Sequence, residues 1–178
     1  EPYMRSSDIV SFDLSAIKQA DAPDSTFPSP NGIESHHACI LSRYAGMSDR
    51  VSSFGIFELN CIENLNSTIR SNQTVNLIAQ MMWYFIEGFS LRLNDTPSMA
   101  TLNNNYQKYL IPLPSTDLQY VFYKSKVTGR WWVSSSMEFE ADAHIKECII
   151  ACSYEDYLNA NAGDMSKRIY RLLKRKLI

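Results

Sequence analysis

The chain lacks a strong excess of charge of either sign. Its 178 residues carry 17 Lys and Arg against 19 Asp and Glu, which gives a formal net charge of -2. A balance so close to neutral produces no electrostatic pull toward nucleic acid or an anionic membrane surface, and we expect neither as a partner. The sequence also lacks a basic segment followed by an apolar one at its start. We therefore expect a cytoplasmic protein without a signal peptide.

Cysteines are few, and their spacing in the sequence does not match that of a zinc site. Four cysteines are present, and one pair among them, Cys148 and Cys152, is closely spaced. Zinc sites usually show two such short-spaced pairs of ligands, and this chain has one. We interpret all four cysteines, including Cys39 and Cys61, as reduced thiols rather than as disulfides.

No apolar run is long enough to cross a membrane. The most apolar stretch, residues 73–92, is predicted to be one helix, but several polar and charged side chains interrupt it. With 45% hydrophobic residues, the chain has enough apolar side chains for one core of ordinary size. We expect the helix to face this core with the apolar side chains that recur at helical spacing, namely Val75, Ile78, Met82, Phe85, Ile86 and Phe89.

The sequence does contain a buried strand that ends in a carboxylate. Ile9, Val10 and Phe12 form a short apolar run, and Asp13 follows at its carboxyl end, before a proline-rich loop at residues 15–32. Open α/β sheets place their ligands at the carboxyl ends of their strands, so Asp13 is a candidate metal ligand. The alternative is an aspartate that ends a strand and accepts hydrogen bonds from loop amides.

Three segments in this region carry a family resemblance. Residues 11–19 are Ser-Phe-Asp-Leu-Ser-Ala-Ile-Lys-Gln, residues 23–28 are Pro-Asp-Ser-Thr-Phe-Pro, and residues 31–33 are Asn-Gly-Ile. They are similar, in order and without a gap, to the patterns Ser-Phe-Asp-x-Asp-x-x-Asp-Pro, Pro-Gly-Thr-Gly-Thr-Pro and Gly-Gly-Leu. These patterns form the metal signature of the ureohydrolase superfamily, which includes arginase, agmatinase and formimidoylglutamase. The match is partial.

Two downstream segments extend the resemblance. Residues 53–60, Ser-Phe-Gly-Ile-Phe-Glu-Leu-Asn, resemble the family's next strand, which ends in a Glu-Val-Asn-Pro element. Residues 72–79 resemble the helix that follows this strand. The resemblance therefore covers about residues 8–92, and it is closest to divergent bacterial arginase-like or formimidoylglutamase-like members.

The resemblance implies a fold and a reaction. The fold would be α/β, a three-layer sandwich with a mostly parallel sheet. The reaction would be hydrolysis of a C–N bond in a linear amidine or guanidine, such as formimidoylglutamate or arginine, at two manganese ions that share a hydroxide. Asp13 takes the place of a metal ligand of the family, and Glu58 takes the place of the glutamate that faces the substrate.

This chain departs from the family at the metal strand. Ser15 replaces the second aspartate of the signature, and Lys18 replaces the third. A serine hydroxyl is a weak neutral ligand, whereas a hard divalent cation favours carboxylates, so the manganese site would be degenerate. Asp21 and Asp24 in the adjacent loop are candidate substitutes.

Further ligands of the family's metal centre come from an earlier histidine motif and from Asp-Ala-His-x-Asp, and neither pattern precedes Asp13. The later Asp142-Ala143-His144 lacks the second aspartate, and we interpret it as chance. We expect the C-terminal half of a longer protein, which takes its N-terminal half as a partner and forms a homo-oligomer. Two functions remain open: a metal-dependent hydrolase with a degenerate site, or a non-catalytic pseudoenzyme that acts as a scaffold or interaction module.

The adjacent histidines His36 and His37 offer another possible ligand pair. They are expected early on a helix over residues 36–46, with Ser35 as its N-cap and Gly46 at its end. Neighbouring residues of a helix point about 100° apart, which argues against joint binding of one ion from one face. We predict a pair of surface histidines.

Beyond residue 92 the pattern changes. Residues 93–116 contain three prolines and three consecutive asparagines, which predict a linker across the surface. Residues 119–124 and 130–134 are rich in β-branched and aromatic side chains and predict a hairpin. Trp131 and Trp132 would face opposite sides of its second strand, so that one can be buried while the other stays free to contact a ligand or another subunit.

The last part of the chain predicts a short strand and two helices. Residues 149–151 are expected to be the strand, and Ser153 with Asp156 forms a capping box for the helix after it. Residues 165–178 alternate basic and apolar side chains, which predicts a helix docked by its apolar stripe; the alternative is a basic helix that contacts acidic partners or RNA.

We therefore expect two domains in sequence. Residues 1–95 would be the C-terminal half of an arginase-like α/β domain. Residues 96–178 would be an extension, with the hairpin and the amphipathic helices packed on that same domain.

Overall fold

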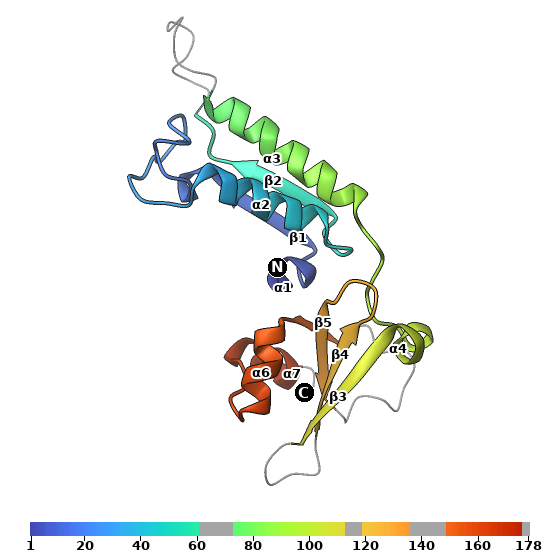
Figure 1. Cartoon of the computed structure of the whole chain (residues 1–178). Coiled ribbons are helices and arrows are strands. Elements are labelled where there is room, and N and C mark those ends of the chain that lie inside the picture. Colours follow the sequence, from blue (N-terminus) through green and yellow to red (C-terminus); the bar gives the residue numbers. More distant parts are fainter. Residues whose placement is uncertain (61–72, 113–118, 136–148, 176–178) are drawn as a thin grey trace, which may run out of the picture. The chain divides into compact units, whose positions relative to one another are not determined.

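A computed structural model describes residues 1–60, 73–112, 119–135 and 149–175 (Figure 1). The chain divides into two compact units. Unit 1 includes Tyr3–Leu93, and unit 2 includes Asn94–Ile178. Each unit has a sheet of its own, and the two sheets differ in the direction in which their strands run.

Unit 1 is built around two parallel strands, as the sequence predicts for its metal strand and the strand after it. The strands are β1 (Ile9–Asp13) and β2 (Ser53–Phe57), and their register pairs Ile9 with Ser53 and Asp13 with Phe57. The helices of this unit are α1 (Pro2–Arg5), the short 3-10 helix η1 (Leu14–Ala16), α2 (Ser35–Gly46) and α3 (Gln73–Ser90).

The helices of unit 1 cover one face of this sheet. Val10 and Phe12 of β1 are buried against side chains of α2 and α3, and Phe54 of β2 stacks on Phe85 of α3 with ring centroids 5.0 Å apart. The alternate residues of β1 are exposed, with Ile9 70% accessible. The described residues of unit 1 therefore form two layers, and the predicted three-layer sandwich is not confirmed.

Two glycines let α2 and α3 lie in close contact. A Cβ atom built on Gly46 would meet the carbonyl oxygen of Phe85 at 2.1 Å, and one built on Gly88 would meet that of Arg43 at 2.2 Å. Distances this short are far inside van der Waals contact, so each position accepts only a residue without a side chain.

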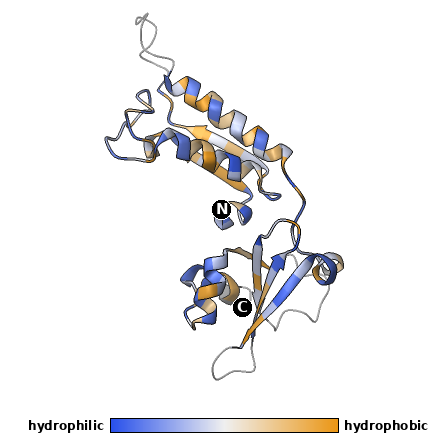
Figure 2. Ribbon diagram, viewed as in Figure 1, coloured by the Kyte–Doolittle hydropathy of each residue, from blue (hydrophilic) through white to orange (hydrophobic). Residues whose placement is uncertain are grey.

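The face of α3 that meets the core differs from our prediction. Leu77 and Met81 are buried. Of the six side chains that we expected to face the core, Ile78 and Phe85 do pack against it, whereas four are exposed, namely Val75, Met82, Ile86 and Phe89. Hydrophobic and hydrophilic residues alternate around α3 along its length, so spacing alone does not define one apolar face (Figure 2). The contact at Gly88 decides which side of the helix turns toward α2.

Unit 2 is built around an antiparallel sheet with the strand order β3-β4-β5-β6. The predicted hairpin is confirmed as β4 (Gln119–Ser125) and β5 (Trp131–Ser135), and the predicted last strand as β6 (Ile150–Cys152). The parallel sheet that we expected is the sheet of unit 1, whereas the sheet of unit 2 is antiparallel and extends the expected hairpin by a strand on either side.

The predicted linker at residues 93–116 is wrong as well. It contains the helix α4 (Met99–Asn105) and the strand β3 (Tyr106–Pro112), which pairs with β4 over its whole length. The asparagines lie inside α4, and Pro112 lies at the last pair of an edge strand, where no hydrogen bond from its nitrogen is needed. The three asparagines and Pro112 thus occupy positions where regular structure tolerates them, and Pro114 lies outside the described residues.

Both faces of the unit 2 sheet are covered. Trp131 packs in one apolar cluster with the helices α6 (Tyr154–Asn161) and α7 (Lys167–Arg175), and Trp132 packs in another with α4. The two tryptophans do face opposite sides, but both are buried, so the expected free tryptophan is not found. The sequence shows the alternation of a strand but not which layers cover its two faces.

The predictions for the last helices are confirmed. Ser153 accepts a hydrogen bond from the amide of Asp156, whose carboxylate accepts one from the amide of Ser153, and this capping box opens α6. Ile169 and Leu173 of α7 are buried in the core of unit 2. Among the described residues, no helix is both long and apolar enough to span a membrane.

The cysteines and the late histidine are only partly described. Cys39 is a buried free thiol whose pKa is raised by its burial, and Cys152 is buried too. Cys61, Cys148 and the Asp142-Ala143-His144 segment lie outside the described residues.

Candidate functional site at the carboxyl edge of the parallel sheet

Asp13 and Glu58 lie at the same edge of the unit 1 sheet. Asp13 is the last residue of β1 and pairs with Phe57, the last residue of β2, so Glu58 is the next residue along from that pair. Because β1 and β2 are parallel, both carboxylates follow the carboxyl ends of their strands. The structure therefore places both sequence-predicted acids at the edge where α/β proteins bind their ligands.

The Asp13 carboxylate caps the short helix η1. Its Oδ1 accepts hydrogen bonds from the backbone amide of Ser15, at 2.8 Å, and from the Ser15 hydroxyl. These two donors, the hydroxyl first, lower the pKa of Asp13, because they favour its charged form. Asp13 is exposed, and its Oδ2 has no hydrogen-bond partner among the described residues.

Ser15 and Lys18, at the positions of the two missing signature aspartates, both interact with carboxylates of this region. The Ser15 hydroxyl donates to Asp13. Lys18 Nζ lies 3.3 Å from Glu34 Oε1 and 3.7 Å from Asp21 Oδ2, so its charge is directed toward the start of α2. The Lys18 ammonium is thus paired with carboxylates of the residues that follow it.

Asp21, one of the two candidate substitute ligands, serves as the cap of α2. Its Oδ2 accepts a hydrogen bond from the Ser35 amide at 2.8 Å, and this bond is the largest cause of its lowered pKa. Our prediction of Ser35 as the N-cap is therefore wrong: Glu34 occupies that position and makes no side-chain cap bond. A carboxylate from a distant loop supplies the acceptor, which no local sequence pattern shows.

Glu58 leaves β2 in an unusual backbone conformation. Its φ angle is 68°, in the left-handed region that residues with side chains rarely adopt. Its carbonyl accepts a hydrogen bond from the Thr26 amide at 2.8 Å, and the Asn60 amide donates to the Asp24 carbonyl at 2.9 Å. The proline-rich loop is thus bonded to the end of β2 on both sides of the bridge between Ser25 and Leu59.

The same loop is also tied to α3. The Asp24 amide donates to the Thr74 hydroxyl at 3.0 Å, and Thr74 is buried in the first turn of that helix. Ser25 is buried too, and its hydroxyl has no hydrogen-bond partner among the described residues. A buried hydroxyl without a partner is uncommon.

The described residues do not fit a manganese centre on their own. A pair of divalent ions needs several anionic oxygen ligands, and this edge presents Asp13 and Glu58 with the neutral hydroxyl of Ser15. In the described part of the chain, Asp13 belongs to no group of three side chains whose ligand atoms lie within 4.8 Å of one another. The metal assignment of Asp13 and Ser15 stays a prediction.

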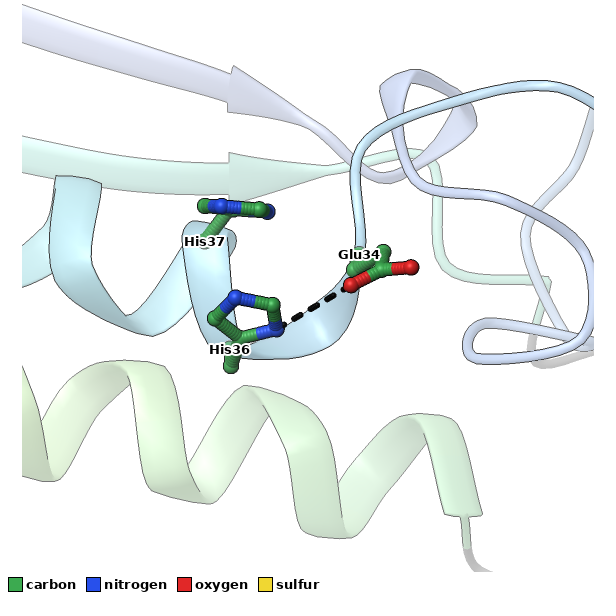
Figure 3. Close-up of side chains that lie close together, drawn as sticks. All are labelled: Glu34, His36 and His37. Atoms are coloured by element: carbon green, nitrogen blue, oxygen red, sulfur yellow. Dashed lines mark ion pairs between the residues drawn. The ribbon is translucent and has the colours of Figure 1, made fainter.

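One such group exists elsewhere, at the start of α2, and sequence reasoning missed it. Ligand atoms of Glu34, His36 and His37 all lie within 4.8 Å of one another (Figure 3). Both histidines are exposed, as predicted for a surface pair, but their imidazole centroids are 3.8 Å apart, closer than we expected for neighbouring residues of a helix. The 100° separation holds for the Cα–Cβ bonds, but each ring extends beyond Cβ and can rotate toward the other.

No protein-family model and no curated protein matches this sequence. Among solved structures, the chain is similar to formiminoglutamase of Trypanosoma cruzi with Mn²⁺, at 24% identity and a TM-score of 0.42, over 47% of this chain and 26% of that one. Formimidoylglutamase from Bacillus subtilis matches at 18% identity and 0.42, over 48% and 25%. Arginase from Bacillus caldovelox matches at 19% identity and 0.37, over 43% and 24%.

The chain spans about a quarter of the length of each of these structures. A likeness of this size concerns part of a fold, and it assigns no metal, substrate or role to any residue of this chain.

Proposed function

We propose that this chain belongs to an arginase-like protein that binds a linear amidine or guanidine, such as formimidoylglutamate or arginine, at the carboxyl edge of its parallel sheet. Glu58 would accept hydrogen bonds from the cationic nitrogens of this ligand. The observation that supports the proposal is the position of Glu58: it follows β2 directly, beside Asp13, in a left-handed conformation that the loop at residues 24–26 holds in place.

The chemistry of Glu58 suits such a ligand. Amidinium and guanidinium groups are planar cations with pairs of parallel N–H donors, and a carboxylate can accept two of them at once. Glu58 is exposed, so its carboxylate can meet a ligand from solvent. A sterically disfavoured backbone at the end of a strand is also a feature that clusters at ligand sites.

Hydrolysis of the C–N bond is the reaction that the motif resemblance implies. Because the described residues do not assemble a manganese centre, we propose this activity only for a protein in which further ligands join Asp13. The partners proposed with it are a small amidine or guanidine substrate, the N-terminal half of the same protein and a second copy in a homo-oligomer. The proposed location is the cytoplasm.

A non-catalytic role is the second candidate, and one observation favours it. The two signature positions that would bring carboxylates hold Ser15, which bonds to Asp13, and Lys18, which is paired with Glu34. In this case the protein would keep the fold and act as a scaffold or interaction module.

Ligand binding tests the role of Glu58 directly. We expect the full-length protein to bind arginine or formimidoylglutamate, and we expect Glu58→Gln to weaken binding at least about tenfold, because a neutral amide loses the charge-assisted bonds. Glu87→Gln is the matched control, since it removes an exposed carboxylate that pairs with Arg43 on α2 and α3. Equal affinities of Glu58→Gln and the unmodified protein in titration calorimetry would rule out this role.

Manganese binding separates the two candidates. The full-length protein and a Ser15→Asp/Lys18→Asp variant are titrated with Mn²⁺ while free Mn²⁺ is followed by electron paramagnetic resonance. An unmodified protein that binds two ions per chain and releases ammonia, formamide or urea from a substrate contradicts the non-catalytic role. An unmodified protein that binds none and turns over none, beside a variant that gains affinity, contradicts the hydrolase.

A further inference from the structure

We propose that Glu34, His36 and His37 form a surface site for a divalent transition-metal ion of the zinc class. The site lies at the start of α2, where Glu34 is the N-cap residue and the two histidines belong to the first turn (Figure 3). It uses none of the residues of the proposed amidine site, so either proposal can fail without the other.

The geometry of the three side chains comes close to that of a bound ion. His36 Nδ1 lies 3.4 Å from Glu34 Oε2, and ligand atoms of all three residues lie within 4.8 Å of one another. Ligands of a tetrahedral zinc ion stand about 3.3 Å apart, as follows from metal–ligand distances of about 2.0–2.1 Å. All three side chains are exposed, so small rotations can close the remaining gap without disturbing the core.

The backbone that carries these side chains is held in place on both sides. The amide of Ile33, just before Glu34, donates to the Ala16 carbonyl at 2.9 Å, and the Ile33 carbonyl accepts from the Lys18 amide at 3.1 Å. The amide of Ser35, just after Glu34, donates to Asp21. Fixed ligand positions lower the ordering cost of binding, which favours a defined site over a chance encounter.

Lys18 leaves one oxygen of Glu34 for the ion. Its Nζ lies 3.3 Å from Oε1, whereas Oε2 is the oxygen that faces His36. This lysine therefore orients the carboxylate, but its charge also opposes a cation nearby, as does the positive end of the α2 dipole. We expect a single ion bound more weakly than in a closed structural zinc site, with open positions filled by water.

The donor set selects the class of metal. Two imidazole nitrogens with one carboxylate oxygen suit zinc, copper or nickel, whereas calcium, magnesium and manganese prefer oxygen ligands alone. The site is thus chemically different from the manganese centre that the motif resemblance implies.

Zinc titration of the full-length protein tests this site, with variants chosen so that each result decides. We expect calorimetry to show one Zn²⁺ per chain. We expect His36→Ala and His37→Ala each to lower the zinc affinity at least about tenfold, because even the loss of a residue that only supports a metal ligand typically costs that much. His144→Ala is the matched control, because it replaces the third of the three histidines of the chain. A Cys148→Ser/Cys152→Ser variant tests the alternative thiol site.

The outcome that supports the proposal is loss of binding in both α2 variants with unchanged binding in the two controls. A Co²⁺-loaded protein should then show no thiolate-to-metal charge-transfer absorption. Unchanged zinc affinity in His36→Ala and His37→Ala overturns the proposal, and so does loss of binding in either control. Far-UV circular dichroism of each variant verifies that α2 still forms, and Glu34→Gln provides a third ligand variant that leaves both histidines in place.

Discussion

The two units of this chain differ in how many faces of their sheets are covered by helices. In unit 2 the described helices cover both faces of a four-stranded antiparallel sheet. In unit 1 the described helices cover one face of a two-stranded parallel sheet, and large apolar side chains such as Ile9 and Trp83 stay accessible. The candidate site therefore lies in the unit whose sheet is covered on one face by the described helices, and not in the unit whose sheet is covered on both.

A pair of aspartates shows the same contrast at the level of one side chain. Asp95 of unit 2 is buried, and its carboxylate accepts hydrogen bonds from the hydroxyls of Tyr106, Ser125 and Thr128. Asp13 of unit 1 is exposed and is bonded by one neighbour, Ser15. A fully satisfied buried carboxylate fixes structure, whereas an exposed one with a free oxygen remains open to a ligand.

The largest expected effect is on the glycine contact of unit 1. Gly88→Ala should lower the free energy of unfolding by about 3 kcal/mol or more, because the new Cβ meets the Arg43 carbonyl and forces α2 away from α3. Gly163→Ala in unit 2 is the matched control, with open space around its Cβ and only the strain of a positive φ, about 1 kcal/mol. Urea denaturation of both variants measures the difference, and equal losses would show that the helices are not in close contact.

Two adjacent methionines of α3 give the next effect. Met81 is fully buried and Met82 is 54% exposed. Met81→Ala should lower the free energy of unfolding by about 3 kcal/mol through lost burial and a residual cavity. Met82→Ala should change it by less than about 0.5 kcal/mol. A larger loss in Met82→Ala would mean that the exposed face of α3 is covered in the protein in solution. Unit 1 would then be as enclosed as unit 2.

The buried carboxylate of unit 2 should show a smaller effect. Asp95→Ala leaves three hydroxyl groups without their acceptor, and we expect a loss of about 2 kcal/mol in the free energy of unfolding. Thermal unfolding followed by the near-ultraviolet signal of Trp131 and Trp132 measures it. Asp164→Ala, at an aspartate exposed in the same unit, serves as the control. Identical midpoints in the two variants would contradict the role of Asp95.

The smallest effect is a change in titration. The Ser15 hydroxyl and amide lower the pKa of Asp13, so the folded state gains stability above the ordinary carboxyl pKa of about 3.9 and loses it as the pH falls below that value. Ser15→Ala removes the hydroxyl and should raise the Asp13 pKa toward its ordinary value. Carboxyl resonances followed by nuclear magnetic resonance from pH 2 to 6 measure this shift, and an unchanged midpoint would show that the hydroxyl does not bond to Asp13.

The sequence predicts the elements of this fold better than their surroundings. The strands β1 and β2, the helix α2, the hairpin and the capping box at Ser153 all carry local signals, and each is present. The strand β3 was not predicted, because the prolines and asparagines in its region suggest a linker and the pairing with β4 is not visible in the local sequence. The buried face of α3 was not predicted, because it depends on the close approach of Gly46 to Phe85 and of Gly88 to Arg43, residues that are far apart in the sequence.

The candidate site divides in the same way. The positions of Asp13 and Glu58 at one edge follow from parallel strands, which the order of elements predicts. Two other interactions could not be predicted, namely the cap on α2 from Asp21 and the ion pair of Lys18 with Glu34. Both depend on the conformation of the long loop before α2, and hydrophobic periodicity does not predict the conformation of a loop. The bridge between Lys18 and Ser29 is one of the few contacts that define it.

The left-handed backbone at Glu58 makes the stability of the fold and the proposed binding of a ligand oppose each other. Glycine adopts this conformation without a steric penalty, so Glu58→Gly should raise the free energy of unfolding by up to about 1 kcal/mol while it deletes the carboxylate. The chain would thus become more stable by losing the very group that is proposed to hold its ligand.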